Sequence, residues 1–313
     1  MLYRKFGRTN LSVSTLGFGG SSLGGVFGPV DESTSIRTVN TALDCGINLF
    51  DTAPFYGATR AETALGRALR TIPRERFFVS TKVGRYGPTQ AEFDFSADRT
   101  LRSIDESLAR LGLDHVDLLQ AHDIEFGETR QIIEETLPAL EKIKASGKAR
   151  FIGISGLHLH LLARVVEQAP LDFVQTYCHG TLVDSTLQDW LPRFERAGLG
   201  VFNSAPLAMR LLSDQGPPDW HPAPPRVRQA CAEAAAYCRA HQVDFSEIAL
   251  RYSLTLPGVH CTILGASSPD EVLRNVRACE APSPSAEMLR PLLEILKPAL
   301  GVSWPSGRPE NQP

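Results

Sequence analysis

The sequence predicts a (β/α)8 barrel, and three observations support that fold class. Eight short apolar runs with the composition of β-strands recur along the 313-residue chain. Amphipathic stretches with the period of an α-helix lie between these runs. No G-x-G-x-x-G pattern opens a helix after the first run. Its absence counts against the dinucleotide-binding unit of a doubly wound open sheet, which is the alternative fold.

The predicted strands are apolar along most of their length, as expected where both faces are covered. In chain order they span residues 13–20, 48–53, 77–83, 116–122, 149–156, 173–178, 200–206 and 261–267.

Predicted helices follow several of these strands, at residues 32–46, 96–112, 135–147 and 268–279. The second helix places Ile104, Leu108 and Leu111 on one face, and the last opens with a serine cap and a proline in its first turn. Residues 212–226 form a proline-rich loop, and residues 281–313 form a final helix and an extended tail. We expect one domain, residues 1–313, with a barrel core over about 13–280 and the final helix and tail over 284–313.

Composition and charge exclude several classes of partner. Hydrophobic residues make up 42% of the chain, and the net charge is −3 with no basic block, so we expect no nucleic acid or acidic membrane surface as a partner. The longest apolar runs are short and broken by charges, so we expect no segment that spans a bilayer, and MLYRKFGRTN at the N-terminus contains no apolar stretch of signal-peptide length. We therefore expect a cytoplasmic protein, either a monomer or a homodimer. The six cysteines include no C-x-x-C pair, so they indicate reduced thiols and no metal site.

Ionisable side chains stand at the ends of three consecutive predicted strands. Asp51 ends the second strand and Tyr56 follows it, Lys82 ends the third, and His122 ends the fourth. Taken alone, each has a structural explanation: a turn cap, a packing aromatic, a surface lysine and a satisfied histidine. In a barrel, however, the carboxyl ends of neighbouring strands meet above one mouth, where such enzymes carry their chemistry.

These four residue types together can move a proton while a hydride leaves or joins a carbon that bears oxygen. A nearby lysine is expected to lower the pKa of a tyrosine from ~10, and an aspartate keeps the lysine charged. A histidine can orient a hydroxyl or carbonyl oxygen by hydrogen bonding. The sequence therefore predicts an oxidoreductase site.

Asp51, Tyr56, Lys82 and His122 resemble the Asp-Tyr-Lys-His tetrad of the aldo-keto reductase superfamily. Members of that superfamily are (β/α)8 barrels with an N-terminal β-hairpin, which residues 3–20 resemble. Within it, the sequence is most similar to the aldose 1-dehydrogenase group. The segments that carry this closer likeness are HDIEFG (122–127), YCHG (177–180), DSTLQDWLP (184–192), SAPLAM (204–209), QGPPDWHPA (215–223) and WPSG (304–307).

The resemblance implies roles for the tetrad. Tyr56 would be the general acid and base, Lys82 and Asp51 would tune it, and His122 would orient the sugar oxygen. It also implies a nicotinamide cofactor. The residues expected to hold that cofactor are Gly20, Ser21, Ser155, Gln175, Ser204, Pro206, Leu207, Gly265, Ser267, Ser268, Arg274 and Asn275.

Two of the implied cofactor positions depart from the superfamily pattern. Gly156 stands where many members have an asparagine, which weakens the expected contact with the nicotinamide amide. Ser204 replaces an aromatic residue that often stacks on the nicotinamide, and the narrower group lacks that aromatic residue too.

Charge near the eighth predicted strand favours NAD over NADP. Asp270 and Glu271 head the following helix, and residues 265–268 contain no cation to meet a 2′-phosphate. Arg274 is the one cation that could reverse this preference.

Substrate-contact candidates are Phe27, Phe55, Asp123, Tyr177 and His179, since aromatic faces and polar side chains suit a pyranose. Trp304 is a further candidate to cover the barrel mouth, or else to dock elsewhere.

The resemblance implies oxidation of the anomeric hydroxyl of an aldose to its lactone. The sugar would be L-galactose or a relative such as L-fucose or D-arabinose. The alternatives are an NADPH-dependent aldehyde or ketone reductase, a dehydrogenase of a pyridoxal-type alcohol, and a nucleotide-sensing regulatory barrel without enzyme activity.

Overall fold

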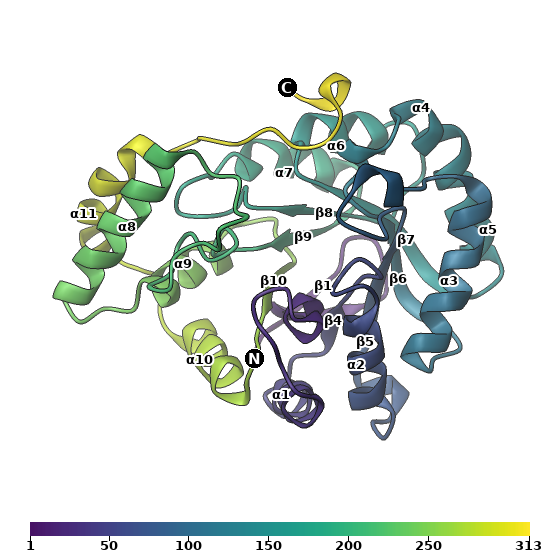
Figure 1. The fold of residues 1–313 in the computed structure, drawn as a ribbon, viewed down its shortest axis with the longest axis horizontal. Helices are drawn as coiled ribbons and strands as arrows, with labels where there is room; N and C mark the ends of the chain where they lie inside the picture. The colour runs from purple at the N-terminus through teal and green to yellow at the C-terminus, as the bar shows by residue number, and fades with distance from the viewer.

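The computed structural model describes residues 1–313, and its centre is a closed barrel of eight parallel strands (Figure 1). The last barrel strand pairs with both the seventh and the first, so the predicted (β/α)8 barrel is confirmed and the open-sheet alternative is wrong. The strands are Leu16–Gly19 (β3), Leu49–Asp51 (β4), Phe78–Val83 (β5), Val116–Ala121 (β6), Ala149–Gly156 (β7), Phe173–Tyr177 (β8), Gly200–Ser204 (β9) and Cys261–Gly265 (β10).

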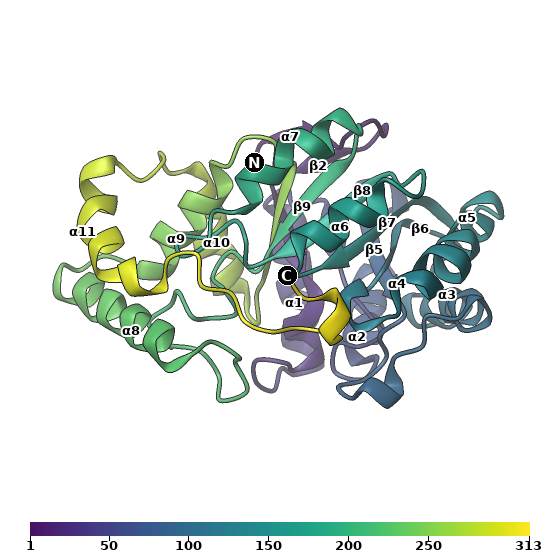
Figure 2. The same cartoon turned by 90° about the horizontal axis from the view of Figure 1, so that it is seen from above.

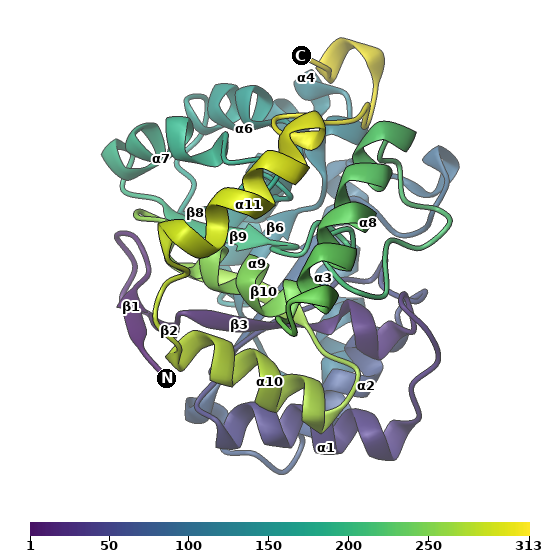
Figure 3. The ribbon, with the colours of Figure 1, turned by 90° about the vertical axis from the view of Figure 1, so that its left-hand side faces the viewer.

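Helices surround the barrel and cover its outer face (Figure 1). They are Glu32–Asp44 (α1), Arg60–Leu69 (α2), Ala97–Leu111 (α3), Thr129–Gln131 (α4), Leu137–Ala145 (α5), Leu159–Val166 (α6), Leu187–Arg196 (α7), Pro225–Ala240 (α8), Phe245–Leu254 (α9), Pro269–Glu280 (α10) and Ala286–Leu296 (α11). A π-helical turn, Ile132–Thr136, leads into α5. Figure 3 shows α8 and α11 side by side on one flank, and α1 and α10 together on the adjoining one. None of the helices has both the length and the apolar character needed to cross a membrane.

The first predicted strand, residues 13–20, is divided in the structure. Its beginning belongs to β2 (Ser12–Ser14), which pairs antiparallel with β1 (Tyr3–Lys5), and its end forms β3. Thr15 separates the two because the chain changes partner there, from β1 in the hairpin to β10 in the barrel. The hairpin implied by the family resemblance is therefore present.

The hairpin closes the amino-terminal end of the barrel. Phe6 in its loop is fully buried and stacks on Phe202 at 4.3 Å between ring centroids. Gly200 makes room for this ring, because a Cβ there would lie 2.5 Å from Phe6. Gly7 has a φ of +53°, and a Cβ on it would lie 2.3 Å from the Gly200 nitrogen, so the turn requires glycine.

The C-terminal tail returns over the opposite end of the barrel. After α11 the chain crosses from the α8 side to the α4 and α6 side, as Figure 2 shows from above. The backbone N–H of Gly301 donates to the Val183 carbonyl at 2.7 Å along this path. The predicted final helix and tail are therefore present, and the tail borders the carboxyl ends of the strands.

We predict that Phe6→Ala lowers the free energy of unfolding by about 3–5 kcal/mol, because it removes a fully buried ring and leaves a cavity. Equilibrium denaturation measures the change. Lys5→Ala, at an exposed neighbouring position, should change stability by less than about 0.5 kcal/mol. Equal effects of the two substitutions would contradict the role given to Phe6.

Candidate active site

Asp51 and Lys82 meet inside the barrel because of strand register. Asp51 pairs with Ser80 across β4 and β5, and Lys82 lies two residues further along β5, on the same face as Ser80. The Lys82 Nζ donates to Asp51 Oδ2 at 2.7 Å and to the Thr52 carbonyl at 2.8 Å. The lysine is 1% exposed and the aspartate 2%, so this ion pair is fully enclosed.

Tyr56 approaches the ion pair from the loop after β4. The next three residues, Gly57, Ala58 and Thr59, all have positive φ, which turns the chain sharply into α2. A Cβ on Gly57 would lie 2.1 Å from the Gly24 carbonyl oxygen, so the turn is packed against the loop after β3. The Lys82 Nζ lies 4.8 Å from the centroid of the Tyr56 ring.

His122 completes this group. It follows β6 directly, and its backbone N–H donates to the Val83 carbonyl at 2.9 Å. Its ring stands perpendicular to that of Tyr56, with the two centroids 5.6 Å apart. The structure therefore brings together the four side chains that the sequence placed at three strand ends.

Burial sets the ionisation of His122 and Tyr56. It lowers the pKa of His122 to about 3, with smaller contributions from the Lys82 and Arg85 charges, so the imidazole is neutral. Burial also raises the pKa of Tyr56, and the Lys82 charge offsets only part of this. The expectation of a net lowered tyrosine pKa is therefore wrong, because desolvation of the phenolate outweighs the attraction of the lysine.

The pKa of Lys82 is raised. Burial alone would lower it, but the negative charge of Asp51 and the Tyr56 phenol together outweigh that effect. The ammonium group is therefore charged at neutral pH.

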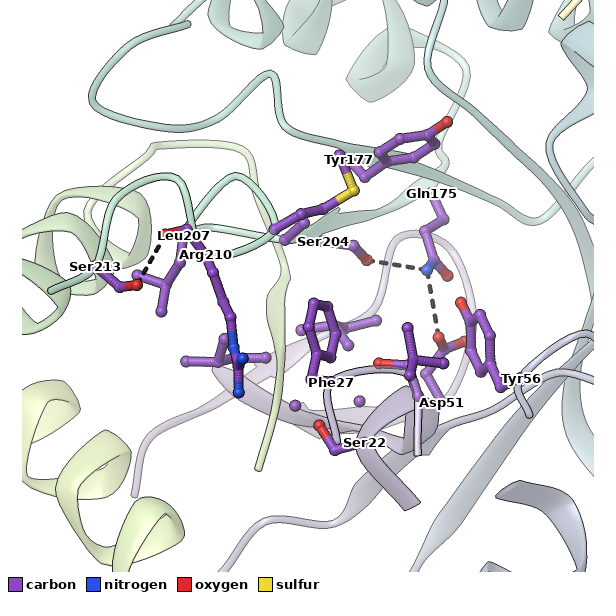
Figure 4. A pocket seen from close by; sticks show the side chains of 18 of the residues that line it. Ser22, Phe27, Asp51, Tyr56, Gln175, Tyr177, Ser204, Leu207, Arg210 and Ser213 are labelled. Carbon is purple, nitrogen blue, oxygen red and sulfur yellow. Dashed lines mark hydrogen bonds between the residues drawn. The ribbon is translucent and has the colours of Figure 1, made fainter. Parts of the chain in front are cut away.

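Polar side chains on neighbouring strands form hydrogen bonds with Asp51 and with one another. The Gln120 amide donates to Gln175 Oε1 at 2.8 Å. The Gln175 amide donates to Ser204 Oγ at 2.9 Å and to Asp51 Oδ2 at 3.4 Å (Figure 4). Ser155 Oγ accepts from the Asp123 backbone N–H at 3.1 Å. Side chains on β6, β8 and β9 thus orient Asp51, because the Gln120 amide also donates to Asp51 Oδ1 at 3.4 Å.

One large cavity runs from these residues across the carboxyl end of the barrel. Its volume of about 1270 Å³ exceeds the ~300–1,000 Å³ typical of a pocket for one small ligand, so a dinucleotide and a second molecule fit together. All four tetrad residues line it. So do most of the expected cofactor residues: Ser21, Ser155, Gln175, Ser204, Leu207, Gly265, Ser267, Arg274 and Asn275.

Comparison with known proteins agrees with this geometry. The family model described as "Aldo/keto reductase family" matches residues 15–292. The chain belongs to the aldo-keto reductase family. Over 98% of both chains it is 46% identical to an L-galactose dehydrogenase of Arabidopsis thaliana. It is 31% identical to a D-threo-aldose 1-dehydrogenase of a Pseudomonas species, over 87% of this chain and 92% of that one. An aldo-keto reductase structure from Bacillus halodurans superimposes with a TM-score of 0.78 at 29% identity, covering 96% of this chain and 98% of that one.

Three of the residues expected to hold the cofactor do not line the cavity of this aldo-keto reductase. Gly20 is buried against the Asp51 backbone, and Pro206 is buried within its loop. The Ser268 hydroxyl accepts from the Glu271 backbone N–H at 3.3 Å and so caps α10. Their chain neighbours Gly19, Ser21, Ala205, Leu207 and Ser267 line the cavity instead.

The far end of the cavity carries a mixed charge. Glu271 lines it, and its Oε2 accepts from the Ser267 N–H at 2.7 Å and from the Ser267 hydroxyl at 2.9 Å. Arg274 lies 4.0 Å from the other Glu271 oxygen, and Arg277 lines the cavity too, whereas Asp270 does not. Of the two carboxylates that head α10, only Glu271 lines the cavity, but Asp244 and Glu247 at the start of α9 line it as well.

The expected substrate residues divide between two places. Phe27, Phe55, Asp123 and Tyr177 line the main cavity. His179 does not line the main cavity. Its Nδ1 is held by Asp184 at 2.9 Å and by Thr186 at 3.1 Å, which turns the ring towards a separate small cavity behind Trp304. Trp304 itself lines both cavities, so the tail does border the mouth.

Two arginines in the cavity wall besides Arg277 were not anticipated from the sequence. Arg85 pairs with Asp123 and lies over the Phe55 ring at 3.9 Å. Burial opposes ionisation of Asp123, but His122 and the Arg85 guanidinium together keep its pKa below the usual value. Arg210 reaches from the loop after β9 towards Phe27, 5.1 Å from its ring centroid (Figure 4). Arg85 follows Lys82 by three residues, and this short spacing is a feature of the sequence that could have indicated that Arg85 lies near the site.

Proposed function

We propose that this protein oxidises the anomeric hydroxyl of an aldose to the aldonolactone, with NAD⁺ as hydride acceptor. The observation that carries the proposal is the enclosed Asp51–Lys82 pair beside Tyr56 and a neutral His122, at one end of a cavity that accommodates a dinucleotide. L-galactose is the proposed first substrate, with L-fucose and D-arabinose as relatives. Similarity to the L-galactose and D-threo-aldose dehydrogenases supports this choice.

The proposed chemistry divides between the cofactor and the protein. The bound nicotinamide would accept the hydride from C1. Tyr56, in its tyrosinate form stabilised by the charged Lys82, would take the proton of the C1 hydroxyl and become the neutral phenol. His122, neutral because it is buried, would hold the sugar oxygen by a hydrogen bond without competing for its proton.

The cofactor preference is proposed from Glu271. Its two bonds to Ser267 fix a carboxylate in the wall where α10 begins, and a fixed carboxylate repels a 2′-phosphate. Arg274 and Arg277 in the same wall favour the second candidate function, an NADPH-dependent aldehyde or ketone reductase. The preference for NAD⁺ or NADP⁺ separates the two proposals.

Purified protein offered L-galactose, L-fucose, D-arabinose, L-glucose and pyridoxal, each with NAD⁺ and with NADP⁺, should reduce NAD⁺ fastest with a sugar. Tyr56→Phe should lower kcat for that sugar by about 100-fold or more, the usual contribution of a positioned acid–base group. NAD⁺ affinity, followed by titration, should change little in this variant. Turnover by Tyr56→Phe at the wild-type rate would remove Tyr56 from the mechanism.

Lys82→Met should shift the alkaline rise of the pH–rate profile for oxidation to higher pH. The lysine charge lowers the pKa of Tyr56, so its removal raises that pKa further. Asp51→Asn combined with Lys82→Met is the matched control. It also removes the Asp51 charge that raises the tyrosine pKa, so its profile should lie at lower pH than that of the single variant. An unshifted profile in Lys82→Met would contradict the coupling of the two residues.

The ratio of kcat/KM for NAD⁺ to that for NADP⁺ should be at least about tenfold, which requires only about 1.4 kcal/mol of discrimination. Glu271→Arg should narrow or invert this ratio by supplying a cation for the 2′-phosphate. Glu271→Gln, which removes the charge and keeps an acceptor for Ser267, should have a smaller effect. If the wild type prefers NADP⁺ instead, Arg274→Ala should abolish that preference.

A further inference from the structure

Glu125 is a buried carboxyl group that the proposed chemistry does not use. It lies in the short 3₁₀ turn Ile124–Phe126, after β6, and its exposed fraction is 0%. Its Oε1 accepts hydrogen bonds from three separate parts of the chain. These are the Leu157 N–H at 3.1 Å, the Tyr177 hydroxyl at 3.1 Å and the Ser306 hydroxyl at 3.2 Å. One oxygen atom therefore joins the chain after β7, the end of β8 and the C-terminal tail.

The second oxygen of Glu125 fills the space beside Gly156. Oε2 is buried and has no hydrogen-bond partner, and a Cβ on Gly156 would lie 2.6 Å from it. A side chain at position 156 is thus incompatible with this placement of Glu125. The glycine that departs from the superfamily pattern is explained by the carboxyl group that occupies its side-chain space.

The environment of Glu125 favours a neutral carboxyl. Burial, followed by the negative charge of Asp123, raises its pKa to about 8. The ionisable groups that face it are Asp123, with Arg85 beyond it, and the Tyr177 phenol. The pKa of that phenol is itself raised well above its usual value, first by burial and then by Glu125. Both groups therefore keep their protons at neutral pH, and the contact between them is a neutral hydrogen bond.

The same residue anchors the tail through its backbone. The Glu125 carbonyl accepts from the Arg308 N–H and from the Asn311 side-chain amide, both at 2.9 Å. Gly307 packs directly against the Glu125 carbonyl, since a Cβ on Gly307 would lie 2.2 Å from the carbonyl oxygen. Residues 304–307, which line the cavity, are thereby held in place. Tyr177 also lines the cavity, with its hydroxyl pointing away from Tyr56, Asp51 and Phe27 (Figure 4).

We propose that Glu125 is a positioning residue for substrate, which fixes the Tyr177 ring and tail residues 304–307 as one rigid wall of the cavity. The inference rests on the proposed function for the identity of the substrate as a sugar. A rigid aromatic and polar wall suits a small polyhydroxylated molecule, because less freedom is lost when the molecule binds. Glu125 itself does not contact the tetrad, so its effect should fall on binding rather than on chemistry.

The test compares Glu125→Ala with Glu125→Gln. The alanine variant removes all three hydrogen bonds to Oε1. Losing the two that hold Tyr177 and Ser306 should raise the KM for the sugar about tenfold and leave kcat and the KM for NAD⁺ within about threefold. The glutamine variant keeps an acceptor for Leu157, Tyr177 and Ser306, so it should match the wild type. An unchanged sugar KM in Glu125→Ala would overturn the proposal, as would a glutamine variant as impaired as the alanine variant.

Hydrogen–deuterium exchange over residues 301–313 provides a measurement that needs no substrate. Exchange in this segment should increase in Glu125→Ala and remain unchanged in Glu125→Gln; Asn311→Ala, which frees the tail without touching Tyr177, is the positive control. Unchanged exchange in the alanine variant would overturn the proposal even if no sugar were oxidised, whereas absent sugar turnover with increased exchange would overturn only the proposed function.

If the alanine variant does not fold, Tyr177→Phe combined with Ser306→Ala removes both hydroxyl donors. An unchanged sugar KM in that variant would likewise overturn the proposal.

Discussion

The ion pair between Asp51 and Lys82 is the interaction on which the rest of the site depends. An ammonium group that is 1% exposed stays charged only if nearby acceptors replace its lost water. Asp51 and the Thr52 carbonyl do so at 2.7 and 2.8 Å. Their positions follow from the register of β4 on β5, two neighbouring strands of the closed barrel. Removing either partner would leave a buried charge alone, so the pair links the stability of the barrel mouth to its chemistry.

Three carboxyl groups near the mouth illustrate how local surroundings set ionisation. Asp51 and Asp123 are each paired with a cation, Lys82 and Arg85. Glu125 has no cation partner, and burial together with the charge of Asp123 raises its pKa to about 8. His122 lies among them and remains neutral, because burial and two cations oppose its protonation. The site therefore combines enclosed, paired charges with neutral hydrogen-bonding groups, which suits proton transfer in a space with little water.

The amino and carboxyl ends of the barrel contribute differently to the protein. The amino end is filled by Phe6, Phe173 and Phe202 and closed by the hairpin, so it contributes stability. The carboxyl end is built from loops of different lengths and from the tail, which crosses it and docks on the turn that contains Glu125. Gly156 is explained by a contact at that end, because Glu125 fills the space in which its side chain would lie.

The sequence by itself determined the barrel, the order of its strands and the four residues of the tetrad, because apolar periodicity and strand-end polarity are local signals. It located the hairpin strand only approximately, since the break at Thr15 reflects a change of pairing partner. Only the tertiary structure decided the sign of the Tyr56 pKa shift, the inward turn of His179 and the role of Glu125 in holding the tail. Each of these depends on burial or on partners distant in the chain: Glu125 and Ser306, which share a hydrogen bond, are 181 residues apart. Desolvation and long-range contacts leave no periodic pattern in a single sequence, whereas strands and helices do.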